Sequence, residues 1–186
     1  MSTLQVNTIS ESTSNSGVTV DGVQLKDNGI QNASGTVLQV VTYMNPITAA
    51  NVITSTSWTD IEQSSGTNLT ATITPKQSDS KLLFQGQFIS YHEYGQKYAY
   101  VQALRDISGG SSDTVVWNGQ YRAENSNENY NDDFPVLYQF IDTPSTTSAV
   151  TYHFQAKVEH SSAEFGLLNY LSGVRSNSIV IWEIGV

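Results

Sequence analysis

The chain has 186 residues, which suits one domain or one domain with an appendage. Its 8 basic and 17 acidic residues give a formal net charge of −9, which argues against nucleic-acid binding, because that affinity comes from clustered Lys and Arg. The absence of cysteine excludes disulfides and thiolate metal sites. Ser, Thr and Asn make up nearly a third of the chain, and Tyr outnumbers Phe by 10 to 6, so the composition favours strands over helices.

The start of the chain gives no sign of export. Residues 1–6 lack the basic and apolar regions of a signal peptide, and no apolar run approaches the roughly 18 residues of a membrane helix. We therefore expect synthesis in a cytoplasm and no insertion into a membrane.

Residues 1–35 form a distinct N-terminal segment, whose apolar residues are too sparse to build a core within one chain. Alternating apolar pairs flank Asp21 and Gly22, which is a hairpin signal, and a second turn signal follows at 26–29. The segment is either a shaft that intertwines with other copies or a loosely held tail, and we favour the shaft. Its candidate contact residues are Val18, Val20, Val23, Leu25 and Ile30.

From residue 36 onward the sequence predicts short strands separated by turn residues. Alternation is clearest at 150–159, where Val150 begins the inward-facing set and Thr151 begins the outward-facing set. The predicted strands are 36–43, 69–74, 81–91, 98–105, 114–117, 136–141, 150–159 and 178–184. About eight strands and no sustained helical period predict an all-β protein, in which residues 36–186 form an antiparallel, jelly-roll-like β-sandwich head.

Aromatic residues are candidates both for the core and for contacts with a ligand. Five are expected to fill the core, namely Tyr98, Tyr100, Tyr138, Tyr152 and Trp182. Three others, Tyr94, Tyr121 and Tyr130, fall in predicted loops, where exposed rings with a polar group suit stacking on a sugar or packing against a partner.

The sequence contains no nucleophile elbow, dinucleotide-binding glycine motif, phosphate loop or zinc-protease motif. The spacing of the three histidines does not indicate a zinc site either. We interpret His153 as a surface residue and His160 as a loop residue. His92 lies between two predicted strands and is either structural or a ligand contact. We therefore expect no catalytic residue and no bound metal.

Residues 123–133 are the densest polar segment, with Asn at every second position from 125 to 131. The segment is a solvated loop, a recognition loop or a calcium site. Its carboxylates, Glu124, Glu128, Asp132 and Asp133, are ligands that calcium accepts, but their spacing is not that of an EF-hand. We expect no cofactor and keep calcium as the alternative. The residues expected to contact a ligand are His92, Tyr94, Tyr121, Asn127, Asn129 and Tyr130.

Several stretches resemble a known family. STLQVNTI (2–9) and SGVTVDGVQLKDNGI (16–30) resemble the N-terminal module of tail-fibre and other fibre-like structural proteins of marine and cyanobacterial tailed phages. TSWTDI (56–61), LTATITP (69–75) and SIVIWEIG (178–185) are similar to the C-terminal β-sandwich heads of these proteins. The distinctive piece is VDGVxLKDxGI; the other stretches are generic β sequence, and the N-terminal segment is short for a fibre shaft.

The resemblance implies a homotrimer that is part of a virion and is assembled in the host cytoplasm. The N-terminal segment would attach to other virion proteins and trimerise through Val18, Val20, Val23, Leu25 and Ile30. The head would bind a glycan or protein of the host surface, with a glycan expected, through three weak sites that act together. The family has no catalytic motif, so the resemblance implies that the chain is not an enzyme.

Three alternatives stay open. The first is a virion decoration or adaptor protein, such as a head or capsid fibre, that binds no receptor. The second is a polysaccharide-degrading tailspike enzyme, which would use carboxylates such as Glu124, Asp132 or Asp133. The third is a free, monomeric carbohydrate-binding module.

Overall fold

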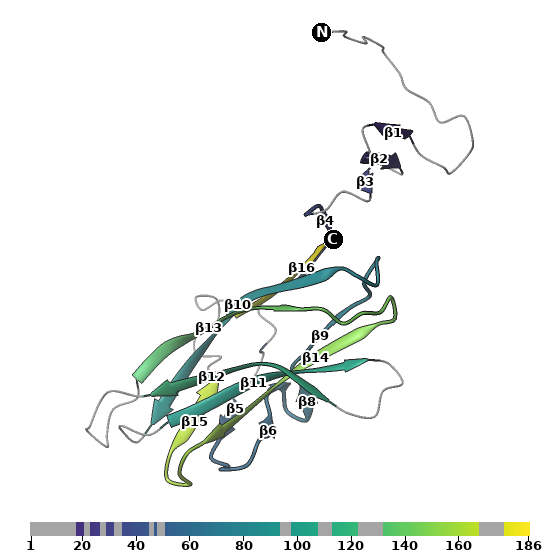
Figure 1. Ribbon diagram of the computed structural model, residues 1–186. Helices are drawn as coiled ribbons and strands as arrows, with labels where there is room; N and C mark the ends of the chain where they lie inside the picture. Colours follow the sequence, from purple (N-terminus) through teal and green to yellow (C-terminus); the bar gives the residue numbers. More distant parts are fainter. Residues whose placement is uncertain are drawn as a thin grey trace.

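The computed structural model describes residues 18–20, 23–26, 29–31, 35–44, 47, 51–93, 98–107, 113–122, 132–167 and 177–186. Strands are the only regular elements within these ranges, and their pairings are antiparallel (Figure 1). None of these ranges contains a helix long and apolar enough to cross a membrane. The prediction of an all-β protein is confirmed.

Two sheets stack on each other to form the head (Figure 1). Sheet I consists of β4 (Val37–Met44), β5 (Asn51–Ile53), β10 (Lys81–Glu93), β13 (Asp132–Asp142), β15 (Glu164–Leu167) and β16 (Ser178–Ile184). Sheet II consists of β6 (Thr59–Asp60), β9 (Thr70–Ile73), β11 (Tyr98–Ile107), β12 (Thr114–Arg122) and β14 (Val150–Val158). A separate small hairpin consists of β7 (Glu62–Ser64) and β8 (Thr67–Asn68).

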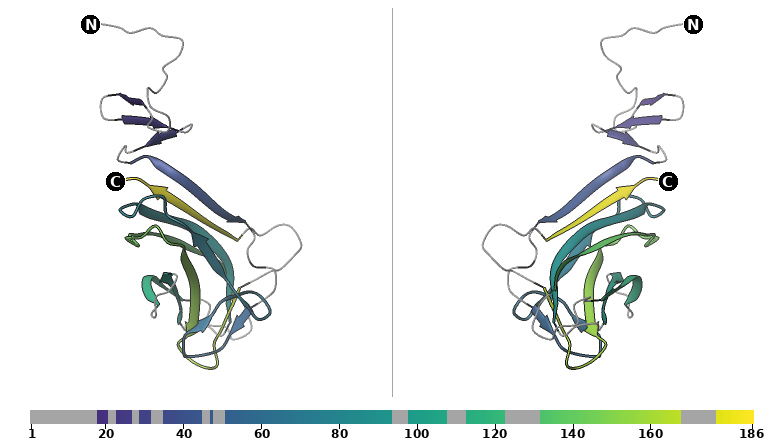
Figure 2. Two further views of the ribbon diagram at one scale, coloured as in Figure 1. Left: turned by 90° about the vertical axis from the view of Figure 1, so that its right-hand side faces the viewer. Right: turned by 90° about the vertical axis from the view of Figure 1, so that its left-hand side faces the viewer.

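The strand order is that of a jelly roll. In sheet I, β16 lies between β4 and β10, and β13 pairs with the other side of β10. In sheet II, β11 lies between β12 and β14, and β9 and β6 both pair with the far side of β14. The chain therefore passes repeatedly from one sheet to the other, and the prediction of a jelly-roll-like sandwich is confirmed. Figure 2 shows β4 as the outermost strand, beside β16.

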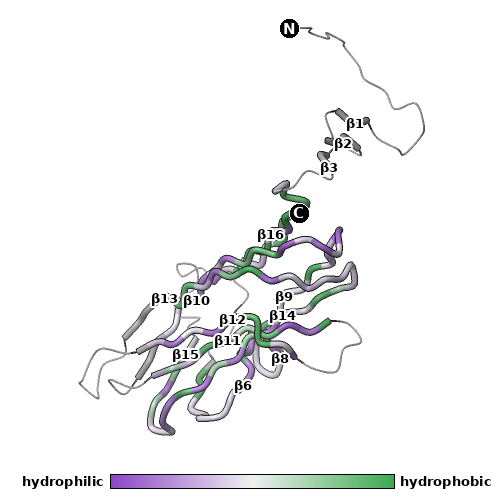
Figure 3. The backbone as a smooth tube through the Cα atoms, viewed as in Figure 1, coloured by the Kyte–Doolittle hydropathy of each residue, from purple (hydrophilic) through white to green (hydrophobic). Residues whose placement is uncertain are grey.

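The core lies between the sheets, and strand alternation builds it. In β14, Val150, Tyr152, Phe154, Ala156 and Val158 are buried, as predicted, and the intervening residues are not. Phe84 and Phe88 of β10 meet this strand from sheet I. The ring centroids of Phe84 and Tyr152 are 4.4 Å apart, and those of Phe88 and Phe154 are 5.1 Å apart. Figure 3 shows the resulting mixture of hydrophobic and hydrophilic positions along the strands.

Two expectations need correction. The described residues of the head contain thirteen strands, β4 to β16, rather than about eight, because β5 to β8 and β15 are two- to four-residue strands without a visible alternation. Tyr138 and Tyr152 are buried as expected, but Tyr98, Tyr100 and Trp182 are only half-buried. They lie on outward-facing positions, since their neighbours Ala99, Val101 and Ile181 fill the inward ones.

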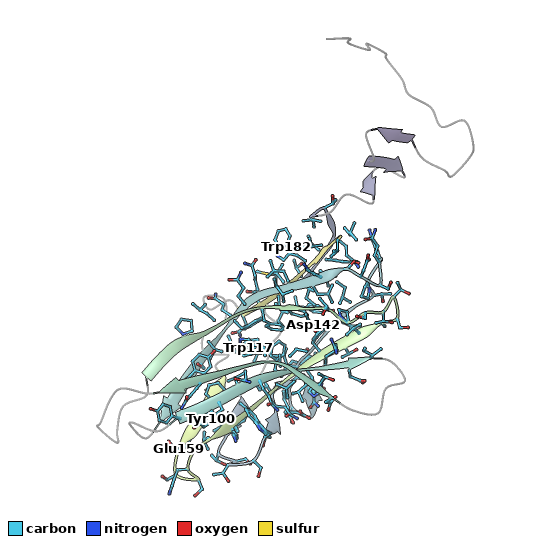
Figure 4. The ribbon with its side chains drawn as sticks, viewed as in Figure 1. Tyr100, Trp117, Asp142, Glu159 and Trp182 are labelled. Atoms are coloured by element: carbon cyan, nitrogen blue, oxygen red, sulfur yellow. The ribbon has the colours of Figure 1, made fainter. Side chains whose placement is uncertain are left out.

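Two buried polar networks connect the strands. Asp142 of β13 accepts hydrogen bonds from Arg105 Nη1 (2.6 Å) and Tyr152 Oη (2.7 Å), which both come from sheet II. Figure 4 shows Asp142 and Trp117 between the two sheets. On the other side of Leu82 in sheet I, the fully buried carboxylate of Glu183 accepts hydrogen bonds from four groups: Gln39 Nε2, Lys76 N, Gln77 N and Ser80 Oγ. The donors to Glu183 come from β4 and from the connection between β9 and β10.

The N-terminal segment forms its own three-stranded sheet of β1 (Val18–Val20), β2 (Val23–Lys26) and β3 (Gly29–Gln31). Its register pairs Val18 with Leu25, Leu25 with Ile30, and Val20 with Val23, so these five positions share one face. These strands are three or four residues long, and a unit of this size usually needs other chains, disulfides or a metal to be stable. The chain then enters β4 beside the C-terminal end of β16, where Gly35 N donates to Gly185 O and Gly185 N donates to Thr36 O, both at 2.8 Å.

Candidate functional site

The outer face of sheet II combines aromatic rings with side-chain amides. The register of the strands brings these residues together. Tyr100 of β11 lies opposite Gln120 of β12 and Lys157 of β14, while Gln102 lies opposite Gln155. The short strand β6 then pairs Asp60 with Gln155 and so places Trp58, two residues earlier, on the same side. We name this surface the polar–aromatic face and define it by Trp58, Asp60, Asn68, Tyr100, Gln102, Gln120, Gln155 and Lys157.

The first row of this face is a lysine held between two rings. Lys157 Nζ lies 4.8 Å from the ring centroid of Trp58 and 5.3 Å from that of Tyr100. Such cation–π contacts are worth about 0.5–1 kcal/mol each at exposed sites. On the other side of Tyr100, Gln120 Nε2 lies 3.5 Å from the tyrosine hydroxyl. The row therefore presents two oriented rings with a fixed positive charge between them.

The second row is a chain of hydrogen-bonded amides that runs parallel to the first. Gln102 Nε2 donates to Gln155 Oε1, and Gln155 Nε2 donates to Asp60 Oδ1, both at 2.8 Å. Asn68 Nδ2 donates to the other carboxylate oxygen, Asp60 Oδ2, also at 2.8 Å. Because each amide is oriented by the next, the row fixes which donors and acceptors point outward.

The combination of the two rows suits a neutral carbohydrate. A sugar ring has an apolar face, which packs on an aromatic ring, and a rim of hydroxyls, which pair with amides and carboxylates. The described part of the face has one lysine and one aspartate among its eight residues, so it favours neither an anionic nor a cationic ligand. No group of three or more His, Asp or Glu among the described residues is arranged to hold a metal ion.

Most of the predicted ligand contacts fall outside the described residues. This holds for Tyr94, Asn127, Asn129 and Tyr130, and for Glu124 and Glu128 of the calcium alternative. The backbone of His92 lies in β10, opposite Asp132 of β13 and Phe165 of β15. Asp133 follows in β13, opposite Tyr91.

Tyr121 is the predicted contact whose side chain the structure describes. It lies in strand β12 rather than in a loop, because β12 continues to Arg122. Its half-buried ring packs against the core, and its hydroxyl donates to the Leu137 carbonyl oxygen at 3.3 Å. Burial raises the pKa of Tyr121 to about 12. The structure thus places Tyr121 at the edge between the two sheets, away from the polar–aromatic face.

The sequence contained a partial signal for this face. The alternation in β14 places Gln155, Lys157 and His153 outward, and the structure confirms all three positions. His153 Nε2 lies 3.6 Å from Asp113 Oδ2, and His160 lies in an exposed turn, as interpreted. Nothing in the sequence indicated that Trp58 and Asp60 belong to this face, because a two-residue strand shows no alternation.

Comparisons with known proteins add little. No protein-family model matches the chain, and no curated protein matches it. Among solved structures, the VP2 subviral particle of infectious bursal disease virus is similar over 92% of this chain, with 14% identity and a TM-score of 0.37. The structure of the Gx strain of that virus is similar over 91% of this chain, with 12% identity and a TM-score of 0.34. The chain spans 43% of each of these proteins, and we draw nothing about function from similarities at this level.

Proposed function

We propose that this chain is a homotrimeric virion structural protein of the phage tail-fibre type, whose head binds a neutral glycan of the host cell surface. The binding site of this proposal is the polar–aromatic face. The observation that carries it is the row in which Trp58 and Tyr100 flank Lys157, directly beside the amide chain that ends at Asp60. The resemblance of both ends of the chain to phage fibre proteins supports the fibre type.

The two-part organisation of the chain also supports the proposal. In this proposal the N-terminal sheet, with Val18, Val20, Val23, Leu25 and Ile30 on one face, joins the copies and attaches them to other virion proteins. A single glycan site of this open kind binds weakly, because a flat face buries little of its ligand. Three sites on one particle-bound trimer act at a high effective concentration and so bind a cell surface firmly.

Binding of the full chain to an array of bacterial surface polysaccharides tests the site. We expect Trp58→Ala to weaken binding at least tenfold, because an exposed tryptophan ring that packs on a ligand is a typical hot spot. Gln120→Ala should weaken it several-fold. The control is Thr147→Ala, which removes an exposed polar side chain from the connection between β13 and β14, at the opposite end of β14 from Lys157, and should leave binding unchanged.

Other outcomes would favour the alternatives. If Trp58→Ala and Gln120→Ala bind as tightly as the unsubstituted chain, the polar–aromatic face is not the site. If no polysaccharide binds and antibody against the head leaves adsorption intact, the chain is a decoration or adaptor protein. In our proposal the head binds glycan without cleaving it, so release of fragments from a bound polysaccharide would instead identify a tailspike enzyme.

A further inference from the structure

One row across the outer face of sheet I is apolar throughout, unlike any row of the polar–aromatic face of sheet II. Register places Ile141, Leu83, Trp182 and Val40 side by side in one row across β13, β10, β16 and β4. Leu137 and Met44 lie at the two ends of a parallel row, four residues further along their strands, with Gln87 and Ser178 between them. The row between these two consists of Gln139, Gln85, Val180 and Thr42. We name the apolar part of this surface the apolar face and define it by Ile141, Leu83, Trp182, Val40, Leu137 and Met44. Figure 3 shows the hydrophobic colour of β4 and β16 where they run together.

These side chains are poorly covered by the rest of the chain. The four that lie on the edge strands, Val40, Met44, Leu137 and Ile141, are between 44% and 63% exposed, and Leu83 and Trp182 are half-buried between them. Exposed large apolar side chains gathered in this way mark interaction sites. A sugar would find no partner along the row from Ile141 to Val40, since three of its four side chains have no hydrogen-bonding group and the Trp182 indole nitrogen is buried. The occupant is therefore another protein surface.

We infer that the apolar face packs against other copies of this chain. This inference rests on the proposed homotrimer and names the surface through which its heads meet. Interfaces between identical subunits are more apolar than other protein surfaces, as this face is.

Charge supports a second copy as the occupant. The chain has a net charge of −9, so two copies repel each other over most of their surfaces. Where the outward side chains of β4, β10, β13 and β16 are described, the one charged residue is Lys81, at the margin of the face. Copies can therefore approach closely through this face without placing like charges of the acidic chain together.

The path of the chain also points to this face. The N-terminal segment enters β4, the edge strand of sheet I, and Gly35 and Thr36 are hydrogen-bonded to Gly185 beyond the end of β16. In copies that are joined along their N-terminal sheets, each chain therefore enters its head at β4, beside β16. These two strands carry Val40 and Trp182. The apolar face continues the contact that the N-terminal segment begins.

Thiol labelling of the full chain tests the inference, because the natural sequence has no cysteine. Val40→Cys and Val115→Cys form a matched pair: both replace a valine on the outer face of an edge strand, 44% exposed in sheet I and 49% exposed in sheet II. At micromolar concentration we expect the cysteine at position 40 to react with a maleimide at least tenfold more slowly than the one at position 115. Adding Ile141→Glu to Val40→Cys should remove this protection, because it introduces an acidic residue into the same apolar row as position 40.

Light scattering on the same samples separates the two proposals. A mass of about three times 20.3 kDa with protection at position 40 supports both. A trimer in which both cysteines react at the same rate overturns the assignment of the apolar face and leaves the homotrimer standing. A monomer overturns both, and the face would then belong to a different partner.

Discussion

Gly86 is the position where the packing of the sandwich is most sensitive to a single added methyl group. It lies in the middle of β10, opposite Tyr138 of β13 and Ile179 of β16. The absence of a side chain lets the Tyr138 ring cross over the strand, so that its hydroxyl donates to the Ser178 carbonyl oxygen at 2.6 Å. A Cβ at Gly86 would overlap both this carbonyl oxygen and the Tyr138 ring, closer than real Cβ atoms approach.

The expected loss of stability for Gly86→Ala follows from these contacts. Overpacking of a core costs about 1–3 kcal/mol, and losing the hydrogen bond to Ser178 costs about 1 kcal/mol more. Alanine recovers roughly 0.4–1 kcal/mol by restricting the unfolded chain. The net loss is about 2 kcal/mol, which for a chain of this length lowers Tm by about 4–8 °C.

Thermal and urea unfolding, followed by near-ultraviolet circular dichroism, measure this loss. Gly119→Ala is the matched control, because its Cβ would meet only the ends of the Tyr121 and Trp117 side chains, at 2.9 and 3.0 Å, and these can move. We expect it to cost less than about 1 kcal/mol. Adding Tyr138→Phe to Gly86→Ala should cost less than the sum of the single changes, since both act on the same hydroxyl. If Gly86→Ala is no more destabilising than Gly119→Ala, the close packing of Tyr138 across β10 is refuted.

Two further predictions concern the buried polar groups. Glu183→Gln should lower the free energy of unfolding, measured in urea, by about 2 kcal/mol. The reason is that an amide NH2 group replaces one of the two accepting carboxylate oxygens and then faces another hydrogen-bond donor. A change below about 0.5 kcal/mol would show that the network rearranges freely. Burial raises the pKa of Tyr138 and of Tyr152 well above the usual value of 10, and for Tyr152 the hydrogen bond to Asp142 adds to the effect. Above pH 10 the unfolded chain therefore loses protons that the folded chain keeps, and stability should fall by about 1.4 kcal/mol per pH unit for each tyrosine. Unfolding curves between pH 9 and 11.5, with tyrosine ionisation followed by absorbance, check the slope; a flat profile would contradict it.

The long strands could be predicted because their signal is local. Each of the eight predicted segments corresponds to one long or central strand of the jelly roll, from β4 to β16. In β14 the alternation even identified which residues face the core, since every inward position is apolar and every outward one is polar. A strand that has one buried face and one solvent-exposed face shows this alternation in its sequence.

In β11 and β16 the same reasoning failed, because apolar residues occupy both faces. The sequence favours the large rings of Tyr98, Tyr100 and Trp182 for the core, but the structure gives the inward positions to smaller side chains such as Ala99 and Val101. The reason is volume: the rings of Phe154, Tyr152 and their partners in sheet I already fill the space between the sheets. Displaced outward, Tyr100 became part of the polar–aromatic face and Trp182 part of the apolar face.

The sequence by itself determined the eight strands that show alternation, because alternation is a property of neighbouring residues. The division near residue 35 and the interchain contacts of the N-terminal segment stay predictions. The tertiary structure alone decided which side chains meet. It brought Trp58, which precedes β6, together with Tyr100 of β11 and Lys157 of β14, and aligned Val40, Trp182 and Ile141 in one row, because strand order and register bring together residues that are up to about 140 positions apart. Both surfaces depend on non-local pairing, which no local pattern in the chain records.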